Sequence, residues 1–285
     1  MTGVHSELRR RNRAGTRLRL WEAHVARTTP VTPGCLRVTL GGDGLAPFAD
    51  GALPADAIKL SLPAAPGDNP VIRGVFPNLE IDGPRPAFRP YTVRRFDPLA
   101  CEMDLDVVLH GDGPGARWAR TAVPGQQVQF TGPRSEFWAC PDVDAHVLVG
   151  DATAVPGAVA ILESLPGTEV CALLQVTGPE EHVCDDPRIT WLHDGDDLPT
   201  ALRGLTLPGG RVQAWVAGEA AMVREVRGQL LRERGVDRSD LHATGYWRRG
   251  MTVTETDAGR MAAFTAAQGT ARPYEDHHDI DLAEV

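Results

Sequence analysis

Residues 89–96 read Arg-Pro-Tyr-Thr-Val-Arg-Arg-Phe, and the interpretation of the rest of the chain starts from this stretch. Side chains two apart share a face of an extended strand, so Arg89, Tyr91 and Val93 should point one way and Thr92 and Arg94 the other. The proline removes a backbone donor, which predicts an edge strand or the start of a strand. By itself the stretch fits two readings, a surface strand with solvated arginines or a strand end that holds an anionic, aromatic ligand.

Composition and charge exclude several classes of protein. The chain has 285 residues, enough for two domains, and no apolar run long enough to cross a bilayer. Its amino terminus is arginine-rich without the apolar core of a signal peptide, and its net charge of −9 argues against nucleic acid as a partner. Five scattered cysteines without a CxxC pair suggest reduced thiols. We therefore expect a cytoplasmic protein without membrane insertion.

Residues 17–142 carry the alternation of β-strands. Six segments show it, at 17–25, 35–40, 58–62, 89–96, 103–109 and 128–130, separated by turn residues. Residues 63–88 are rich in proline and glycine and are predicted to form a long loop. This pattern predicts an antiparallel six-stranded β-barrel, preceded by a flexible basic segment at 1–16.

From residue 143 to residue 250 the pattern changes to strands alternating with helices. Strands are predicted at 146–149, 169–176, 189–192 and 212–217, with helices ending near 165 and running from 220 to 234. Such alternation indicates a parallel sheet, so the fold class is β followed by α/β. Residues 251–285 are predicted to form a helix at about 256–268 and an acidic tail. His277 and His278 in that tail are interpreted as solvated, and no metal site is expected.

Two glycine-containing loops follow strands and precede helices. Residues 110–118 read His-Gly-Asp-Gly-Pro-Gly-Ala-Arg-Trp, in which exposed backbone amides and a helix N-terminus could hold a diphosphate. Residues 150–156 read Gly-Asp-Ala-Thr-Ala-Val-Pro and lie at the carboxyl end of a parallel strand, where ligands of such sheets bind. Each loop alone is a weak signal, and a plain connecting turn is the alternative at 150–156.

Taken together and in order, these motifs resemble the siderophore-interacting protein family. The resemblance rests on residues 89–94, 110–119, 132–134, 150–156, 217–219 and 245–250, and it covers about residues 17–250. Members are flavin-dependent ferric-siderophore reductases of the ferredoxin reductase-like superfamily. The resemblance implies a barrel that binds FAD, a domain at 143–250 that binds NADH or NADPH, and a ferric siderophore as the substrate.

The resemblance also implies which residues bind each ligand. Arg89 would pair with the FAD diphosphate, Tyr91 would pack on the flavin–ribityl region and Thr92 would hydrogen-bond the ring system. The full set of cofactor-binding candidates is Arg89, Tyr91, Thr92, Val93, His110, Gly113, Ala116, Arg117, Trp118, Asp151, Thr153, Glu219 and Trp247. A basic triad would bind the siderophore, and its candidates are Lys59, Arg134 and either His242 or Arg248. Lys59 is the only lysine among 29 lysines and arginines.

Two departures from the family pattern bear on these expectations. Ala152 stands where members usually have a glutamate in the nicotinamide turn, and Ala116 stands where a serine is common. Acidic residues follow Thr177 and the next arginine is Arg188, which favours NADH over NADPH because a 2′-phosphate needs cations. No catalytic acid–base pair stands out, as expected where the flavin does the redox chemistry. The alternatives are a general flavin or quinone reductase and a non-catalytic flavin-binding sensor, and a monomer is expected.

Overall fold

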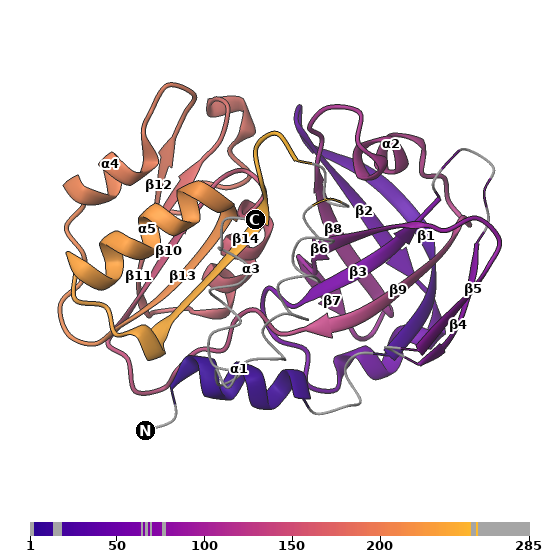
Figure 1. The fold of residues 1–285 in the computed structure, drawn as a ribbon, viewed down its shortest axis with the longest axis horizontal. Coiled ribbons are helices and arrows are strands. Elements are labelled where there is room, and N and C mark those ends of the chain that lie inside the picture. The colour runs from indigo at the N-terminus through magenta and orange to yellow at the C-terminus, as the bar shows by residue number, and fades with distance from the viewer. Residues whose placement is uncertain are drawn as a thin grey trace.

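The computed structural model describes residues 3–13, 19–63, 65, 68, 70–75, 78–251 and 255. These residues form two lobes side by side, a curved antiparallel sheet and a parallel sheet flanked by helices (Figure 1). None of the described helices is long and apolar enough to cross a membrane. The helix predicted at 256–268 and the acidic tail lie outside the described residues.

The antiparallel sheet closes into a barrel because its two edge strands are consecutive in the chain. It contains β1 (Arg19–Thr32), β2 (Cys35–Gly41), β3 (Ala57–Leu62), β6 (Ala87–Thr92), β7 (Arg95–Asp97), β8 (Glu102–Val108) and β9 (Gln127–Arg134). The order is β6-β3-β9-β1-β2-β8-β7, and only Val93 and Arg94 separate β6 from β7. The Arg94 amide donates to the Asp104 carbonyl of β8 at 2.9 Å. The predicted barrel is therefore confirmed, but its sheet has seven strands rather than six, because the strand predicted at 89–96 is divided into β6 and β7 with Val93 and Arg94 between them.

The inner face of the barrel is apolar, as the alternation predicts. Ile58, Leu60, Met103, Leu105 and Phe130 are at most 1% exposed. Helix α2 (Pro114–Thr121) packs on the same core and contributes the buried ring of Trp118, while the short helix η1 (Asp43–Ala49) contributes Leu45 and Phe48. The core therefore fixes the positions of both the strand at 89–92 and the loop that enters α2.

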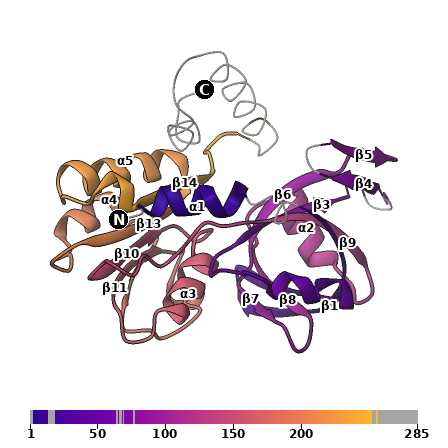
Figure 2. The same ribbon diagram turned by 90° about the horizontal axis from the view of Figure 1, so that it is seen from below.

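The predicted loop at 63–88 is wrong in its central part. It contains a two-stranded hairpin, β4 (Val71–Val75) and β5 (Asn78–Asp82), which projects from the barrel (Figure 2). The Ile72 amide donates to Gln129 Oε1 at 2.9 Å, and Gln129 Nε2 donates to the Ile72 carbonyl at 3.1 Å. The hairpin thus depends on a side chain of a distant strand, which the local sequence does not reveal.

The second lobe is a five-stranded parallel sheet with helices on both faces. Its strands are β10 (Ala145–Gly150), β11 (Glu169–Gln175), β12 (Ile189–Leu192), β13 (Val212–Glu219) and β14 (Leu241–Trp247), in the order β12-β11-β10-β13-β14. Helix α3 (Val155–Ser164) covers one face, and α4 (Leu198–Gly204) and α5 (Ala220–Arg232) cover the other; η2 (Pro179–Glu181) and η3 (Arg238–Asp240) are short 3-10 turns. The parallel sheet is confirmed, while β14 and α4 were not predicted.

The expectation of a flexible segment at 1–16 is wrong for its central part. Residues Val4–Arg13 form helix α1, which lies against the segment joining the two lobes (Figure 1). Val4 and Leu8 are buried with Cys140, and Asn12 Oδ1 accepts from the Ser135 amide at 2.7 Å. The apolar residues Val4 and Leu8 are four apart and so share one helix face, a spacing hidden by the arginines around them.

Candidate functional site

A cavity of about 570 Å³ lies in the seam between the two lobes. The barrel contributes Arg94 and residues 108–110 to its wall. The parallel sheet contributes residues 151–153, residues 175–177 and Trp247, all at or after the carboxyl ends of strands. The order of strands reverses at β10, so this seam lies at the switch point where such sheets bind nucleotides.

Asp151 organises the wall that the parallel sheet contributes. Its Oδ1 accepts from the amide and the hydroxyl of Thr153, at 2.9 and 2.5 Å. Its Oδ2 accepts from the Glu219 amide and from the Trp247 indole nitrogen, each at 2.8 Å. One carboxylate therefore joins the ends of β10, β13 and β14 and sets the orientation of the indole that lines the cavity.

This arrangement requires glycine at two positions beside Asp151. A Cβ on Gly150 would lie 2.6 Å from the Ala217 carbonyl oxygen, which is main chain and cannot rotate away. Gly218 has a φ of +137°, and a Cβ there would lie 2.7 Å from the Asp151 carboxyl carbon. The glycine of the 150–156 turn thus permits close approach of two strand ends, a role distinct from that of a phosphate loop.

Glu219 and Ala152 have different positions in the same wall. Glu219 Oε2 accepts from the amides of Ala221 and Met222, and Oε1 accepts from the Arg249 amide. Glu219 therefore caps α5, and its two oxygens are engaged within the protein. Ala152 lines the cavity, so the missing glutamate leaves a smaller, uncharged surface at that point.

Two bridges connect the lobes beside the seam cavity. Glu181, beside β11, accepts from the Gly34 amide at 2.7 Å and from the Thr32 hydroxyl in the β1–β2 turn. Arg94 donates two bonds to Glu163 of α3, at 2.6 and 2.7 Å. Neither pair was predicted, because the partners lie far apart in the sequence. The bridges fix how far apart the two walls of the cavity stand.

The barrel end near residues 89–92 fits a bound diphosphate. The α2 N-terminus begins after Gly113, which provides no side-chain cap, and the first turn of α2 contains no acidic residue. A Cβ on Gly113 would meet nothing within 4 Å, so the approach to these amides is open. The Tyr91 hydroxyl contacts Gly115, which brings β6 against this helix end. Arg89 is two residues before Tyr91 on the same strand face, so a guanidinium and an uncapped helix end face one region.

The other flavin candidates divide into surface and core positions. Thr92 and Val93 are 9% and 6% exposed, and Tyr246 from β14 lies beside Thr92, with burial raising the pKa of its hydroxyl. Ala116 and Trp118 are each 5% exposed, so their side chains belong to the core. Arg117 remains exposed on α2, and His110 lines the seam cavity. The structure therefore brings the predicted residues to one region, although two side chains serve packing.

The predicted basic triad is only partly assembled. Lys59 pairs in register with Pro90 and Thr131, and Arg134 pairs with Ala57, so the two cations lie on neighbouring strands near each other. Lys59 alternates with the buried Ile58 and Leu60 and so faces away from the core. Arg248 follows β14 and is partly exposed. These three cations are the members of the predicted set that solvent can reach.

The prediction that His242 is a cation facing the substrate is wrong. It is 4% exposed, and its Nε2 lies 2.7 Å from Glu136 Oε2. Glu136 is itself 1% exposed and forms an ion pair with Arg134 at 2.6 Å. The strand β14 turns His242 inward, so it meets a buried carboxylate rather than a ligand. Glu136 was missed by the sequence interpretation; its only signal is the alternate spacing from Arg134 in an extended segment.

The comparisons with known proteins agree with this geometry. Residues 24–137 match the siderophore-interacting FAD-binding domain, and residues 143–250 match the siderophore-interacting protein family. The chain is 33% identical to the ferric vibriobactin reductase ViuB of Vibrio cholerae, over 77% of this chain and 86% of that protein. It is 28% identical to the NADPH-dependent ferric-chelate reductase of Escherichia coli, over 81% and 93% of the two chains.

A solved structure extends the likeness to the whole fold. The siderophore utilization protein from T. fusca is 36% identical and superposes with a TM-score of 0.71, over 83% of this chain and 95% of that one. Both sequence and structure thus match across the barrel and the parallel sheet. The chain belongs to the siderophore-interacting protein family, and its barrel is an FAD-binding domain.

Proposed function

We propose that this protein is an FAD-dependent reductase that passes electrons from NADH to the Fe(III) of a siderophore and releases Fe(II) in the cytoplasm. Relatives named as a ferric vibriobactin reductase and a ferric-chelate reductase support the reaction class. The observation that carries the proposal is the meeting of the two lobes at Tyr246 of β14. Its hydroxyl lies beside Thr92 of the barrel, and the charges of Arg134 and Asp151 are close enough to affect its pKa.

On the barrel side, this chain's residues bind and orient the flavin. Arg89 would hold phosphate oxygens with charge-assisted hydrogen bonds, and the uncapped amides at the start of α2 would bind the same group. Tyr91 and Thr92 would contact the ring system. When bound, FAD accepts two electrons together from a nicotinamide and can give them up singly, which is the exchange a ferric ion needs.

On the other side, residues around Asp151 position the nicotinamide. The carboxylate of Asp151 holds Trp247 and Thr153 in fixed orientations. Its two oxygens already accept four hydrogen bonds, so they have no position left for a hydrogen bond from a further donor. The Arg94–Glu163 pair and the bond from the Gly34 amide to Glu181 hold the two walls together, so they would limit the space between a bound flavin and a bound nicotinamide. No side chain has to transfer a proton in this scheme.

We propose NADH rather than NADPH as the donor. The part of the cavity beyond β11 is lined by Gln175, Thr177, Glu181 and Asp194, and its lining cations, Arg94 and Arg249, belong to other walls. Acidic neighbours tolerate a ribose hydroxyl and repel a 2′-phosphate. Anaerobic stopped-flow measurement of flavin reduction by each nucleotide tests this. Faster reduction by NADPH would contradict it.

The acceptor site is proposed at Lys59 and Arg134, with Arg248 as the third cation in place of His242. Ferric siderophores are often anionic, so exposed cations beside the flavin would bind them without enclosing them. Lys59→Ala and Arg134→Ala should raise the KM for the ferric siderophore and leave flavin reduction by NADH unchanged. Arg95→Ala, an exposed arginine of β7, is the matched control. Equal KM values in all variants would place the acceptor elsewhere.

Steady-state turnover with several acceptors separates this function from its alternatives. Purified protein with FAD should oxidise NADH with a ferric siderophore, and an Fe(II) chelator should trap the product. Turnover with quinones or free flavin but not with ferric chelates would indicate a general flavin or quinone reductase. A flavin that NADH does not reduce would indicate a sensor. We expect the active species to be a monomer, which light scattering tests.

A further inference from the structure

Among the described residues, two arginines line the seam cavity, and they are held in different ways. Arg94 donates two hydrogen bonds to Glu163 of α3, at 2.6 and 2.7 Å, and its side chain is 13% exposed. Arg249 follows β14 and is exposed to solvent. Arg94 therefore serves the bridge between the lobes, whereas Arg249 brings a permanent positive charge to the wall that also contains Trp247.

The backbone of Arg249 is fixed by a turn and by a hydrogen bond. The Met251 amide donates to the Arg248 carbonyl at 3.2 Å, and Gly250 has a φ of +78°, as in a type II turn with Arg249 at its second position. The Arg249 amide donates to Glu219 Oε1 at 3.2 Å. Because Glu219 ends β13 and caps α5, this bond ties the turn to a neighbouring strand end.

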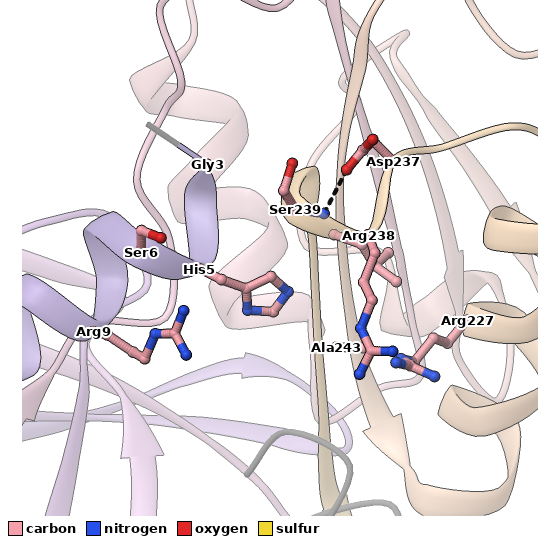
Figure 3. A pocket seen from close by; sticks show the side chains of 10 residues that line it. Gly3, His5, Ser6, Arg9, Arg227, Asp237, Arg238, Ser239 and Ala243 are labelled. Atoms are coloured by element: carbon pink, nitrogen blue, oxygen red, sulfur yellow. Dashed lines mark hydrogen bonds between the residues drawn. The ribbon is translucent and has the colours of Figure 1, made fainter. Parts of the chain in front are cut away.

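The neighbouring arginines of this lobe serve other surfaces. Arg249 is among the residues that line the seam cavity, and Arg248 is not. Arg227 of α5 and Arg238 of η3 line a different cavity, of about 450 Å³, between α1 and the start of β14 (Figure 3). No described residue lines both cavities. A negatively charged group that enters the seam from the side of β14 therefore meets Arg249 rather than these arginines.

The amides that open the two helices at this edge of the sheet are largely engaged. The Val155 amide at the start of α3 donates to the carbonyl three residues earlier at 3.3 Å, and Pro156, the next residue, has no amide hydrogen. At the start of α5 the Ala221 and Met222 amides donate to Glu219 Oε2. A phosphate at this edge would therefore need a cationic side chain in place of the helix N-terminus that often binds it.

We propose that Arg249 binds the phosphate on the nicotinamide side of the dinucleotide. The inference rests on the proposed function, because it concerns the NADH that the seam would hold. A guanidinium presents a planar fork of donors that matches phosphate oxygens. Arg249 lies two residues after Trp247, whose indole donates to Asp151 Oδ2 at 2.8 Å in the wall proposed for the nicotinamide. The adjacent arginines would then divide between two ligands, with Arg249 binding the electron donor and Arg248 contacting the acceptor.

Reduced nicotinamide mononucleotide and reduced nicotinamide riboside differ by this one phosphate, so they test the contact directly. Anaerobic stopped-flow reduction of the full-length, FAD-loaded protein gives a Kd and a saturating rate for each donor. In the wild type the mononucleotide should have the lower Kd. Arg249→Gln should raise the Kd of the mononucleotide and of NADH by about tenfold or more, the effect of losing one charge-assisted hydrogen bond. The Kd of the riboside and the saturating rates should stay unchanged.

Calorimetric titration with NAD⁺, which cannot reduce the flavin, measures binding without turnover. Its affinity should also be about tenfold or more lower in Arg249→Gln, and it should respond less to added salt because one charged contact is gone. Arg249→Lys keeps the charge without the fork and should recover part of the loss. Arg232→Gln is the matched control, since Arg232 is an exposed arginine at the far end of α5 and does not line the cavity; it should behave as the wild type does.

The outcomes separate this inference from the proposed function. An unchanged Kd of the mononucleotide in Arg249→Gln would overturn the inference and leave the proposed function standing. Equal losses with the mononucleotide and the riboside would also overturn it, because they would show that Arg249 only shapes the wall. A wild-type flavin that none of the three donors reduces would refute the proposed function and this inference with it. Flavin content at the wild-type level shows that a variant is folded, so a changed Kd is attributable to the side chain.

Discussion

Replacement of Asp151 by asparagine should disconnect the wall of the seam cavity. The wild-type carboxylate accepts four hydrogen bonds, two on each oxygen, from Thr153, Glu219 and Trp247. Asparagine keeps one oxygen and places an NH₂ group against the other pair of donors. Two hydrogen bonds to a charged acceptor are lost. The two protein groups that donated them then face the new NH₂ group, which is itself a donor.

The size of the effect follows from these contacts. A hydrogen bond to a charged group contributes about 1.5–3 kcal/mol, so two give about 3–6 kcal/mol. Because Asp151 is only partly buried, the lower figure of about 3 kcal/mol is the expected loss of unfolding free energy. That is a large share of the roughly 5–15 kcal/mol that stabilises a typical domain. The looser Trp247 indole should also slow flavin reduction by NADH.

Urea unfolding at saturating FAD measures the first effect and stopped-flow reduction the second. Asp194→Asn is the matched control, since Asp194 lines the same cavity and, among the described residues, no hydrogen bond joins its side chain to the strand ends. The urea midpoint of the Asp151→Asn variant should be lower than that of the wild type, with an unchanged m-value. The reasoning is refuted if Asp151→Asn is within about 0.5 kcal/mol of Asp194→Asn, the range of ordinary surface substitutions.

Three further predictions concern the flavin, the N-terminal helix and pH. Arg89→Ala should release most of the FAD, because one charge-assisted fork is lost, while Arg95→Ala should retain it; equal flavin absorbance in both purified variants would contradict the assignment. Leu8→Ala should cost about 2–4 kcal/mol in urea unfolding, since Leu8 is 2% exposed; no loss would mean that α1 does not pack in solution. The pKa of His5 falls from 6.5 to about 4 on folding, so the unfolded chain binds more protons between these values and stability should decline as pH falls through that window. His5→Gln should make this decline with pH smaller. If the urea midpoint had the same pH profile in the variant and in the wild type, the prediction would be contradicted.

Local periodicity determined the order of the two lobes. The six barrel segments and the parallel strands were predicted because inward and outward side chains alternate over short distances, and packing needs only that pattern. The glycine-containing turns were placed at strand-to-helix junctions for the same local reason. The hairpin at Val71–Asp82 was not predicted, since a contact with Gln129 holds it in place. Strand β14 was not predicted either, since its parallel neighbour in the sheet holds it in place.

Which side chains meet was decided only by the tertiary structure. The sequence indicated His242 as a ligand, but β14 turns it inward onto Glu136, a residue 106 positions away. It indicated that Asp151 lies near the nicotinamide, but it did not show that donors from three strand ends surround that carboxylate. It indicated a flexible amino terminus, yet α1 packs on Cys140 and brings Arg9 towards Arg227 and Arg238. Charge and hydrogen-bonding partners are chosen by proximity in space, and proximity between distant segments exists only once the sheets have formed.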